Sequence, residues 1–161
     1  MGKKELKTNA MRMLERQKIP FTCITYECDG FIDGIQIADQ LKEPHELVYK
    51  TLVTVGKSKE HYVFVIPIEE ELDLKKAART VAEKSLLMLP LKDLTAVTGY
   101  VRGGCTAIGM KKAFPVVVEK HAEALEEMIV SGGKIGMQIR ISPENFQKAT
   151  GAVFEEIIVS G

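Results

Sequence analysis

Two strand-like runs separated by a short polar segment constrain the fold of this chain more than any other feature. The first run extends from Leu47 to Val55 and is rich in valine, leucine and threonine. The polar segment Gly56 to Glu60 follows, and the chain returns as a second apolar run, His61 to Ile68. Apolar, β-branched runs joined by a short turn are typical of an antiparallel hairpin. The sequence therefore predicts a sheet built around this pair of strands.

Short helices and further strands are expected on either side of the hairpin. Thr8, Asp73 and Ser142 are each suited to cap the N-terminus of a helix, and Ser142 is followed by a proline, which favours a first helical turn. The predicted helices are Thr8 to Gln17, Gly34 to Leu41, Leu74 to Val81, Leu91 to Val97, His121 to Met128, and a last one from Ser142 to Gly151. The other predicted strands are Phe21 to Tyr26, Val116 to Val118, Ile129 to Ser131, Met137 to Ile141 and Ala152 to Val159.

The fold class follows from this order of elements. Strands occur both in a hairpin and after helices, which predicts a mixed, strongly curved sheet with helices on its outside, an α+β fold. The chain has 161 residues, of which 45% are hydrophobic. This length corresponds to one domain at about 150 residues per domain, and the apolar content is sufficient to fill its core. We expect residues 1–161 to form a single domain.

Charge and apolar patterning exclude several classes of protein. The formal net charge is +0, but residues 1–112 carry +3 and residues 113–161 carry −3, so a polyanion is expected to approach the first part. No stretch reaches the 18 or so apolar residues of a membrane span, and Met1 to Lys18 lacks the apolar region of a signal peptide. We therefore expect a cytoplasmic protein. Its three cysteines, Cys23, Cys28 and Cys105, form neither a disulfide framework nor a CxxC zinc motif.

Lys50 is the most unusual residue of the first run. With a period of two it shares a strand face with Val48, Leu52 and Thr54, and the opposite face is also largely apolar. A strand that is apolar on both faces is usually central, and an unpaired ammonium there costs several kcal/mol. This favours a lysine that reaches a wet cleft and has a task in it. The alternative is a lysine on an edge strand whose ammonium extends into solvent.

Two glycine-rich segments are further candidates for chemistry. Glycines in the segment 103–109 allow backbone N–H groups to converge on an anion or a developing oxyanion. The segment 131–136 adds a serine and a lysine to the same pattern. Neither matches a nucleotide-binding motif, and each is equally compatible with a plain turn. Tyr26, at the end of a predicted strand, is suited either to line a pocket or to pack at the surface.

A cysteine nucleophile and a metal site have less support. Cys105 lies in the first glycine-rich segment but needs a neighbouring base to react at neutral pH. The histidines His45, His61 and His121 are scattered and show no motif with it or with Ser131. No HxxxH spacing is present, so no metal or other cofactor is predicted.

Several short motifs, in a specific order and spacing over nearly the whole chain, reveal a family resemblance. The chain resembles the YbaK/EbsC-type Cys-tRNA(Pro) deacylases, which are freestanding relatives of the editing domain inserted in bacterial prolyl-tRNA synthetases. The motifs that carry this resemblance are Lys7-Thr8-Asn9-Ala10, Val48-Tyr49-Lys50-Thr51-Leu52, Leu72-Asp73-Leu74-Lys75-Lys76, Thr98-Gly99-Tyr100, Arg102-Gly103-Gly104-Cys105, Ile108-Gly109-Met110-Lys111-Lys112 and Val130-Ser131-Gly132-Gly133-Lys134.

The resemblance implies a mixed, barrel-like sheet flanked by helices, and a trans-editing enzyme acting on the aminoacylated 3′ end of tRNA, with prolyl-tRNA synthetase as an expected partner. In the family mechanism the cysteinyl thiol of the substrate attacks its own ester carbonyl and releases tRNA and a thiolactone. The resemblance implies that Lys50 is essential for catalysis. The residues expected to bind substrate are Tyr26, Gly103, Gly104, Cys105, Thr106, Ala107, Ser131, Gly132, Gly133 and Gln138.

In this mechanism the substrate supplies the nucleophile, so the protein needs no nucleophilic side chain. An intramolecular thiol already has a high effective concentration, so the protein need only orient the ester and stabilise the oxyanion. Backbone N–H groups between Gly103 and Ala107 are the expected donors. Lys50 either anchors the phosphate or ribose of the terminal adenosine or assists thiolate formation, and the sequence leaves both roles open. An alanyl ester would fit the pocket but lacks the thiol.

Two positions depart from the family pattern. Ala107 stands where the family loop usually has proline, so the fixed φ of proline is missing, and Gln138 stands where a site acid is often found. Both bear on substrate preference and rate. Two other functions remain open: a non-catalytic module that binds tRNA or a small molecule in the same pocket, and a hydrolase with Cys105 as nucleophile.

Overall fold

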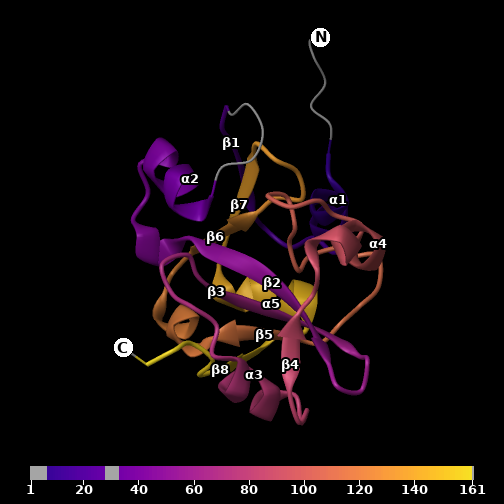
Figure 1. The fold of residues 1–161 in the computed structure, drawn as a ribbon. Coiled ribbons are helices and arrows are strands. Elements are labelled where there is room, and N and C mark those ends of the chain that lie inside the picture. The colour runs from indigo at the N-terminus through magenta and orange to yellow at the C-terminus, as the bar shows by residue number, and fades with distance from the viewer. Residues whose placement is uncertain (1–6, 28–32, 161) are drawn as a thin grey trace.

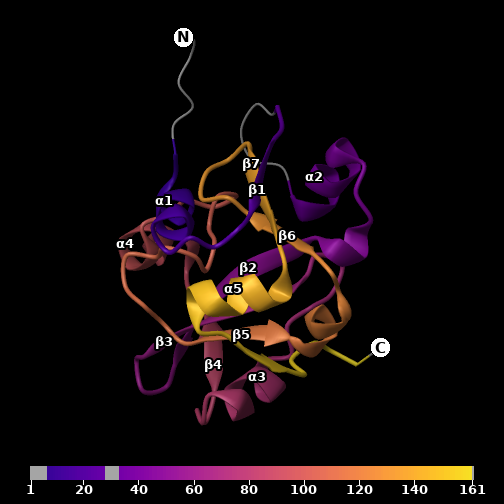
Figure 2. The ribbon, with the colours of Figure 1, turned by 180° about the vertical axis from the view of Figure 1, so that it is seen from behind.

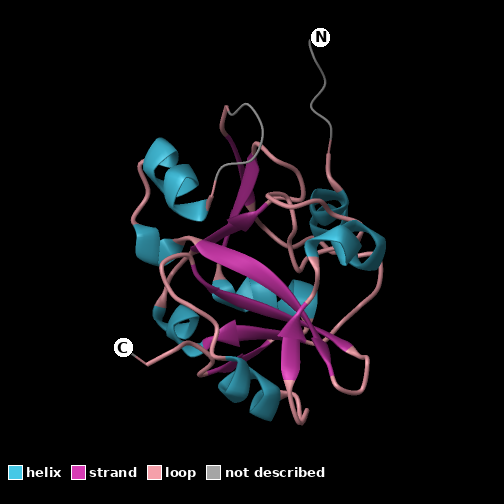
Figure 3. Ribbon diagram, in the orientation of Figure 1, coloured by secondary structure: helices cyan, strands magenta, loops and turns pink. Residues whose placement is uncertain are grey.

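The computed structural model describes residues 7–27 and 33–160, which form two β-sheets and a set of short helices (Figures 1 and 3). Leu6 and Cys28 lie outside the described residues. The α-helices are α1 (Asn9–Arg16), α2 (Gly34–Leu41), α3 (Leu74–Thr80), α4 (Leu94–Thr98) and α5 (Pro143–Thr150). Single 3₁₀ turns cover His45–Leu47, Leu91–Asp93 and Lys120–Ala124. The strands are β1 (Thr22–Thr25), β2 (Tyr49–Gly56), β3 (His61–Pro67), β4 (Leu86–Met88), β5 (Val116–Glu119), β6 (Met128–Ser131), β7 (Met137–Ile141) and β8 (Val153–Glu155).

The predicted hairpin is confirmed and forms the centre of a mixed, five-stranded sheet with the strand order β4-β2-β3-β5-β8. β2 and β3 are antiparallel, with Lys50 opposite Ile66, whereas β3, β5 and β8 run parallel. β4 pairs with β2 only from Thr54 to Gly56. The N–H of Leu89 also donates to the carbonyl of Val53 (2.9 Å). Among the described residues, no strand therefore pairs with this edge of β2 from Tyr49 to Leu52, and the edge is open there.

The second sheet is antiparallel, with the order β1-β7-β6. It meets the first sheet through one isolated bridge, between Val48 and Ile129. The predicted mixed α+β fold is confirmed, but its strands form two sheets that, among the described residues, do not close into a barrel. Beyond Val48, residues Tyr49 to Leu52 of β2 line a cavity.

Three groups of buried apolar residues hold the elements together. The largest lies between the two sheets and includes Tyr49 and Val53 of β2 together with Phe146 of α5. α5 lies behind the five-stranded sheet in Figure 1 and in front of it in Figure 2, so it covers that face. α3 packs on the opposite face, against Phe64 and Ile66. A third group lies under α2, and the alternating residues of β2 thus reach different parts of the core.

Most predicted helices are confirmed, but the prediction of a helix from His121 to Met128 is wrong. The chain makes only a 3₁₀ turn over Lys120–Ala124, and Met128 already begins β6. The buried carboxylate of Glu119 caps the start of this turn and ties it to another segment, since it accepts hydrogen bonds from the N–H groups of His121 (3.3 Å) and Ile157 (2.9 Å). The turn ends at Leu125, whose backbone is extended.

Three further elements differ from the prediction. The closing strand is shorter, because β8 covers only Val153–Glu155 and is followed by a single bridge at Ile158. The short edge strand β4 has no sequence signal beyond three apolar residues and was not predicted. The predicted helix Leu91 to Val97 begins as a 3₁₀ turn and becomes α-helical only at Leu94. Among the described residues, no helix is long and apolar enough to cross a bilayer.

Candidate active site

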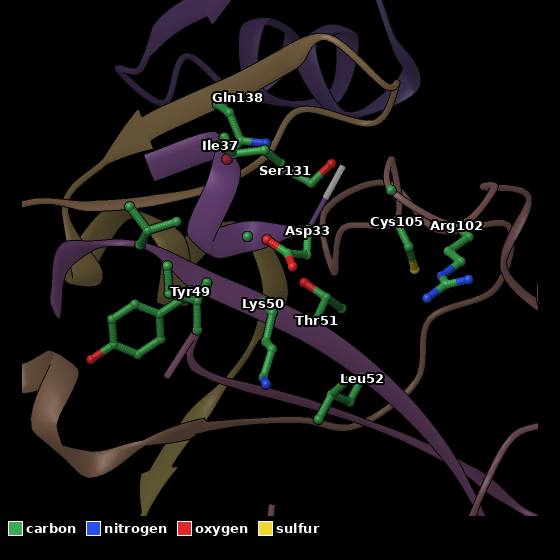
Figure 4. Close-up of a pocket in the computed structure, with 14 residues that line it drawn as sticks. Asp33, Ile37, Tyr49, Lys50, Thr51, Leu52, Arg102, Cys105, Ser131 and Gln138 are labelled. Atoms are coloured by element: carbon green, nitrogen blue, oxygen red, sulfur yellow. The ribbon is translucent and has the colours of Figure 1, made fainter. Parts of the chain in front are cut away.

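A cavity of about 310 Å³ lies where the open edge of β2 faces the start of α2, the loop before Cys105 and the ends of β6 and β7 (Figure 4). Segments that are distant in the sequence therefore meet at one place. The residues predicted from the sequence that line this cavity are Lys50, Gly103, Cys105, Ser131 and Gln138.

Lys50 lies on the face of β2 that also presents Val48 to α2 and Leu52 to the residues under α3. Its side chain is partly buried, and Figure 4 shows it extending away from Ser131 and Gln138. Burial lowers the pKa of the Lys50 ammonium, and attraction to nearby carboxylates, first among them that of Glu71, opposes this shift. The cavity thus contains a partly desolvated cation.

Thr51 projects from the opposite face of β2, toward the space between the two sheets. Its Oγ1 is buried and has no hydrogen-bond partner among the described residues. A buried hydroxyl without a partner is costly, so this atom is suited to a hydrogen bond with a ligand. Lys50 and Thr51 both line the cavity because it extends around the open edge of the strand.

Ser131 and Gln138 are opposite each other in the β6–β7 ladder. Gln138 is only 3% exposed, and the Oγ of Ser131 accepts a hydrogen bond from the N–H of Gly133 (3.3 Å). The two side chains form the wall of the cavity on the side of the smaller sheet (Figure 4).

Gly104, Gly132 and Gly133 were predicted to bind substrate. In the structure they lie where the two glycine-rich turns meet, and they do not line the cavity. A Cβ on Gly104 would lie 2.9 Å from the Cα of Lys134, so only glycine allows the turns to approach this closely. Gly133 has a φ of +101°, and the hydroxyl of Thr8 donates a hydrogen bond to the carbonyl of Gly132 (2.6 Å). Gly104, Gly132 and Gly133 therefore shape the site by holding its two loops together.

Tyr26, Thr106 and Ala107 are also placed outside the cavity lining. Tyr26 is buried at the end of β1, where its N–H donates to the carbonyl of Gly136 (2.9 Å). Thr106 is fully buried, and its hydroxyl accepts a hydrogen bond from the N–H of Ile108 (3.4 Å). Ala107 belongs to the main core and borders a different, smaller cavity. The structure does not bring these three residues into the cavity.

Cys105 reaches the cavity, but its surroundings do not activate it. Burial raises the pKa of the Cys105 thiol to about 11, so at neutral pH the group is a protonated thiol. None of the described residues that line the cavity is a histidine that would serve as a base. This geometry argues against a hydrolase that uses Cys105 as its nucleophile.

Asp33 and Thr51 were not predicted from the sequence as site residues, and Arg102 was named only within the motif Arg102-Gly103-Gly104-Cys105. All three line the cavity. Asp33 caps α2, a signal that is visible in the sequence but that indicates a helix start, not a site. Thr51 is on the opposite face of β2 from Lys50, and the alternation of side chains along a strand therefore does not predict that both residues line one cavity. Among the described residues, no three His, Cys, Asp or Glu side chains come together in a way suited to a metal ion.

Comparison with known proteins identifies the family. Residues 35–149 match the model of the aminoacyl-tRNA editing domain. The chain belongs to this family. The match extends from α2 into α5 and therefore includes Lys50, the loop with Gly103 and Cys105, and the wall formed by Ser131 and Gln138.

Individual relatives agree with this assignment of the editing domain. The chain is 44% identical over 156 residues to EbsC of Enterococcus faecalis, a candidate Cys-tRNA(Pro)/Cys-tRNA(Cys) deacylase, and the match covers 96% of this chain and 95% of EbsC. The crystal structure of a candidate trans-editing enzyme for prolyl-tRNA synthetase shares the fold, with a TM-score of 0.85 at 22% identity over 97% of this chain and all of the other. A hypothetical protein shares it with a TM-score of 0.86 at 17% identity, over 94% of this chain and 99% of the other.

Proposed function

We propose that this editing domain is a trans-editing deacylase that removes cysteine from mischarged Cys-tRNA(Pro). The observation that carries the proposal is the cavity at the open edge of β2, which is lined by Lys50, Arg102 and Thr51 with its unpartnered hydroxyl, in a chain 44% identical to EbsC. The cavity has cationic groups for a nucleic-acid end and polar groups for an aminoacyl ester.

Lys50 and Arg102 are suited to bind the terminal nucleotide. They come from β2 and from the loop before Cys105, so they approach the cavity from two elements (Figure 4). Because Lys50 extends away from Ser131 and Gln138, it is better placed to hold the phosphate or ribose of the terminal adenosine than to touch the thiol. We therefore favour the anchoring role for Lys50.

The bond-breaking step uses the substrate's own thiol. The cysteinyl sulfur, as thiolate, forms a bond to the ester carbonyl carbon; the ester C–O bond breaks, and the 3′ oxygen of the ribose leaves and takes up a proton. The products are tRNA and a thiolactone. Holding thiol, carbonyl and leaving group in one geometry supplies most of the acceleration.

The glycine loop is suited to stabilise the oxyanion. The N–H of Gly104 already donates to the carbonyl of Val101 (2.9 Å) and is committed to the turn. Gly103 and Cys105 line the cavity, so their N–H groups are the candidate donors. One donor to an oxyanion contributes about 3 kcal/mol in comparable sites.

Selectivity arises from size and from chemistry. Ser131 and Gln138 narrow the cavity from the side of the smaller sheet and limit the size of the aminoacyl group. A pocket distinguishes smaller groups by only about 1 to 3 kcal/mol, so alanine would enter. Alanine lacks the thiol, and its ester is therefore expected to survive.

The tRNA acceptor end is the proposed macromolecular partner. Few cations surround the cavity, so binding of tRNA alone is expected to be weak. Association with prolyl-tRNA synthetase would raise the effective concentration of the mischarged end. This activity would place the protein in the cytoplasm, and it requires no cofactor.

The proposed function is tested by incubating the protein with Cys-tRNA(Pro), Ser-tRNA(Pro) and Ala-tRNA(Pro) and measuring the remaining ester. We expect the cysteinyl ester to be consumed and the seryl and alanyl esters to remain, with the Cys105→Ala variant as active as the wild type. Rapid loss of Ala-tRNA(Pro) beside intact Cys-tRNA(Pro) would refute the proposal. Binding without turnover of any ester would identify a non-catalytic module instead.

A further inference from the structure

Asp33 presents a carboxylate of fixed orientation to the cavity. Its Oδ1 accepts a hydrogen bond from the N–H of Gln36 (2.9 Å), and its own N–H donates to Oε1 of Gln36 (3.1 Å). This reciprocal pair is a capping box, which holds the side chain at the start of α2. The second carboxylate oxygen takes no part in the capping box. Figure 4 shows the carboxylate between Ser131 and Thr51, on the side of β2 opposite to the Lys50 ammonium.

Charge distinguishes Asp33 from the other groups around it. Among the described residues that line the cavity, it is the only one with a carboxylate, whereas Lys50 and Arg102 are cationic. Gln138, on the far wall, is neutral. The cavity therefore has one anionic position, and this position lies on the same side of β2 as the unpartnered Oγ1 of Thr51.

An aminoacyl ester carries a group that matches this arrangement. Its α-ammonium is bonded to the carbon next to the reacting carbonyl, and ammonium groups bind best to carboxylates and hydroxyl oxygens. The cations at the cavity serve the nucleic-acid end and would repel the ammonium. Asp33 is thus the lining residue whose charge complements the α-amine.

We propose that Asp33 binds the α-ammonium of the aminoacyl group, with the hydroxyl of Thr51 beside it, and makes the site selective for esters that carry a free α-amine. This inference rests on the proposed deacylase function. Asp33 does not take part in bond breaking; it is a positioning residue that sets the orientation of the thiol and the carbonyl through the carbon between them.

The capping role and the binding role of Asp33 are separable. Asparagine and serine cap helices about as well as aspartate, so Asp33→Asn and Asp33→Ser keep the start of α2 while removing the charge. Their thermal unfolding should match that of the wild type, which shows that any effect on activity does not come from a loss of fold.

The test compares two tRNA esters that differ only in the α-substituent: Cys-tRNA(Pro) and 2-hydroxy-3-mercaptopropionyl-tRNA(Pro), in which a hydroxyl replaces the amine. Both keep the thiol. We expect wild-type kcat/KM to favour the cysteinyl ester by about tenfold or more, as for a hydrogen bond to a charged group. In Asp33→Asn and Asp33→Ser this preference should disappear, through a higher KM for the cysteinyl ester and an unchanged rate on the hydroxy ester.

The outcomes separate this inference from the proposed function. Equal kcat/KM of the wild type on the two esters overturns the role of Asp33, even before a variant is measured. The deacylase function is then unaffected. A variant that loses both activities in the same proportion also overturns it, because the residue is then structural. A wild type inactive on both esters contradicts the deacylase function and this inference with it.

Discussion

Lys50 combines partial burial with a position on an open strand edge. Burial disfavours its charged form and lowers the pKa of its ammonium, so the folded protein accepts a cation there at some cost. A residue that is unfavourable for folding at its position is a sound candidate for function. This interpretation separates the effect of Lys50 on activity from its effect on stability.

Replacing Lys50 by methionine tests that separation. Methionine keeps the apolar length of the side chain and removes the charge, so the Lys50→Met variant should unfold at a temperature equal to or above that of the wild type. Its kcat/KM for Cys-tRNA(Pro) should fall about tenfold or more, the effect of losing one contact between charged groups. The exposed Lys57 provides a matched control, since Lys57→Met should change neither quantity. A Lys50→Met enzyme with wild-type turnover would contradict the anchoring role.

Lys50 could be singled out from the sequence alone, because a lysine among β-branched residues is unusual whatever the fold. Thr51 and Asp33 could not be singled out in this way, because their positions at the cavity depend on tertiary contacts: the Thr51 hydroxyl is notable only once it is known to be buried without a partner among the described residues. The expected contacts of Tyr26 and Ala107 with substrate stay predictions, and in the structure both residues lie outside the lining of this cavity.

The two glycine-rich turns act as one element because they touch through Gly104. A Cβ there would lie within 3.0 Å of three backbone atoms of Lys134, and backbone cannot move aside cheaply. We expect Gly104→Ala to destabilise the protein by about 1 to 3 kcal/mol and to lower deacylation, because Gly103 and Cys105 would shift with the loop. Denaturant unfolding and single-turnover rates measure the two effects.

Gly151 provides the control for Gly104. It ends α5 with a φ of +73° and has nothing within 4 Å of an added Cβ. Gly151→Ala should cost about 1 to 2 kcal/mol through backbone strain alone and leave the rate unchanged. A Gly104→Ala enzyme as fast as Gly151→Ala would show that the contact between the turns does not shape the site.

His45 connects α2 to the end of β3 in a pH-dependent way. Its ring nitrogens lie 2.7 Å from Glu69 Oε2 and 2.7 Å from Asp39 Oδ1. The hydrogen bond with Glu69, followed by that with Asp39, raises the pKa of His45 above its usual 6.5. A raised pKa in the folded state stabilises the protein fully below about pH 6.5, and this contribution is lost as pH rises through the folded value.

The His45→Gln variant should remove this contribution. The stability difference between the wild type and His45→Gln is therefore expected to be larger at pH 6 than at pH 9, measured by denaturant unfolding at both pH values. A difference that stays constant or grows toward high pH would show that the histidine is not charged in the folded protein.

Elements with local signals were predicted well. The spans of α2 and β7 match the sequence prediction, because a capping residue or strict alternation defines their ends. The segment after β5 was misassigned as a helix: the chain becomes extended at Leu125, and the carboxylate of Glu119 holds the start of the turn against the N–H of Ile157, which is distant in sequence. β4 is an edge strand whose pairing with β2 is likewise a long-range contact.

The arrangement of the two sheets defines the site at the level of the whole molecule. Composition and element order predict a mixed α+β fold, but not that the sheets separate after the bridge at Val48 and leave a cavity in the gap. The separation depends on how β2 is partnered along its length, and only the assembled structure shows this. We expect residues 1–161 to unfold as one cooperative unit, as the shared core between the sheets implies.

The charge distribution of the molecule predicts how tRNA binding depends on salt. The net charge is +0, and cations near the cavity are few, among them Lys50, Arg102 and Lys134. Neutralising three or four phosphates of a single-stranded end corresponds to a slope of about −2 to −3 in log affinity against log salt. Filter binding of uncharged tRNA(Pro) between low and physiological salt measures it. A slope near −6 or steeper would indicate a much larger tRNA-binding surface than this site.

The most direct measurement compares the wild-type protein on Cys-tRNA(Pro) and on S-methylcysteinyl-tRNA(Pro), whose sulfur cannot attack the ester. We expect the first ester to be cleaved, with a thiolactone as the initial product, and the second to be as stable as in buffer. Equal cleavage of the two esters would show that the cavity supplies its own nucleophile or water, and would contradict the substrate-thiol mechanism.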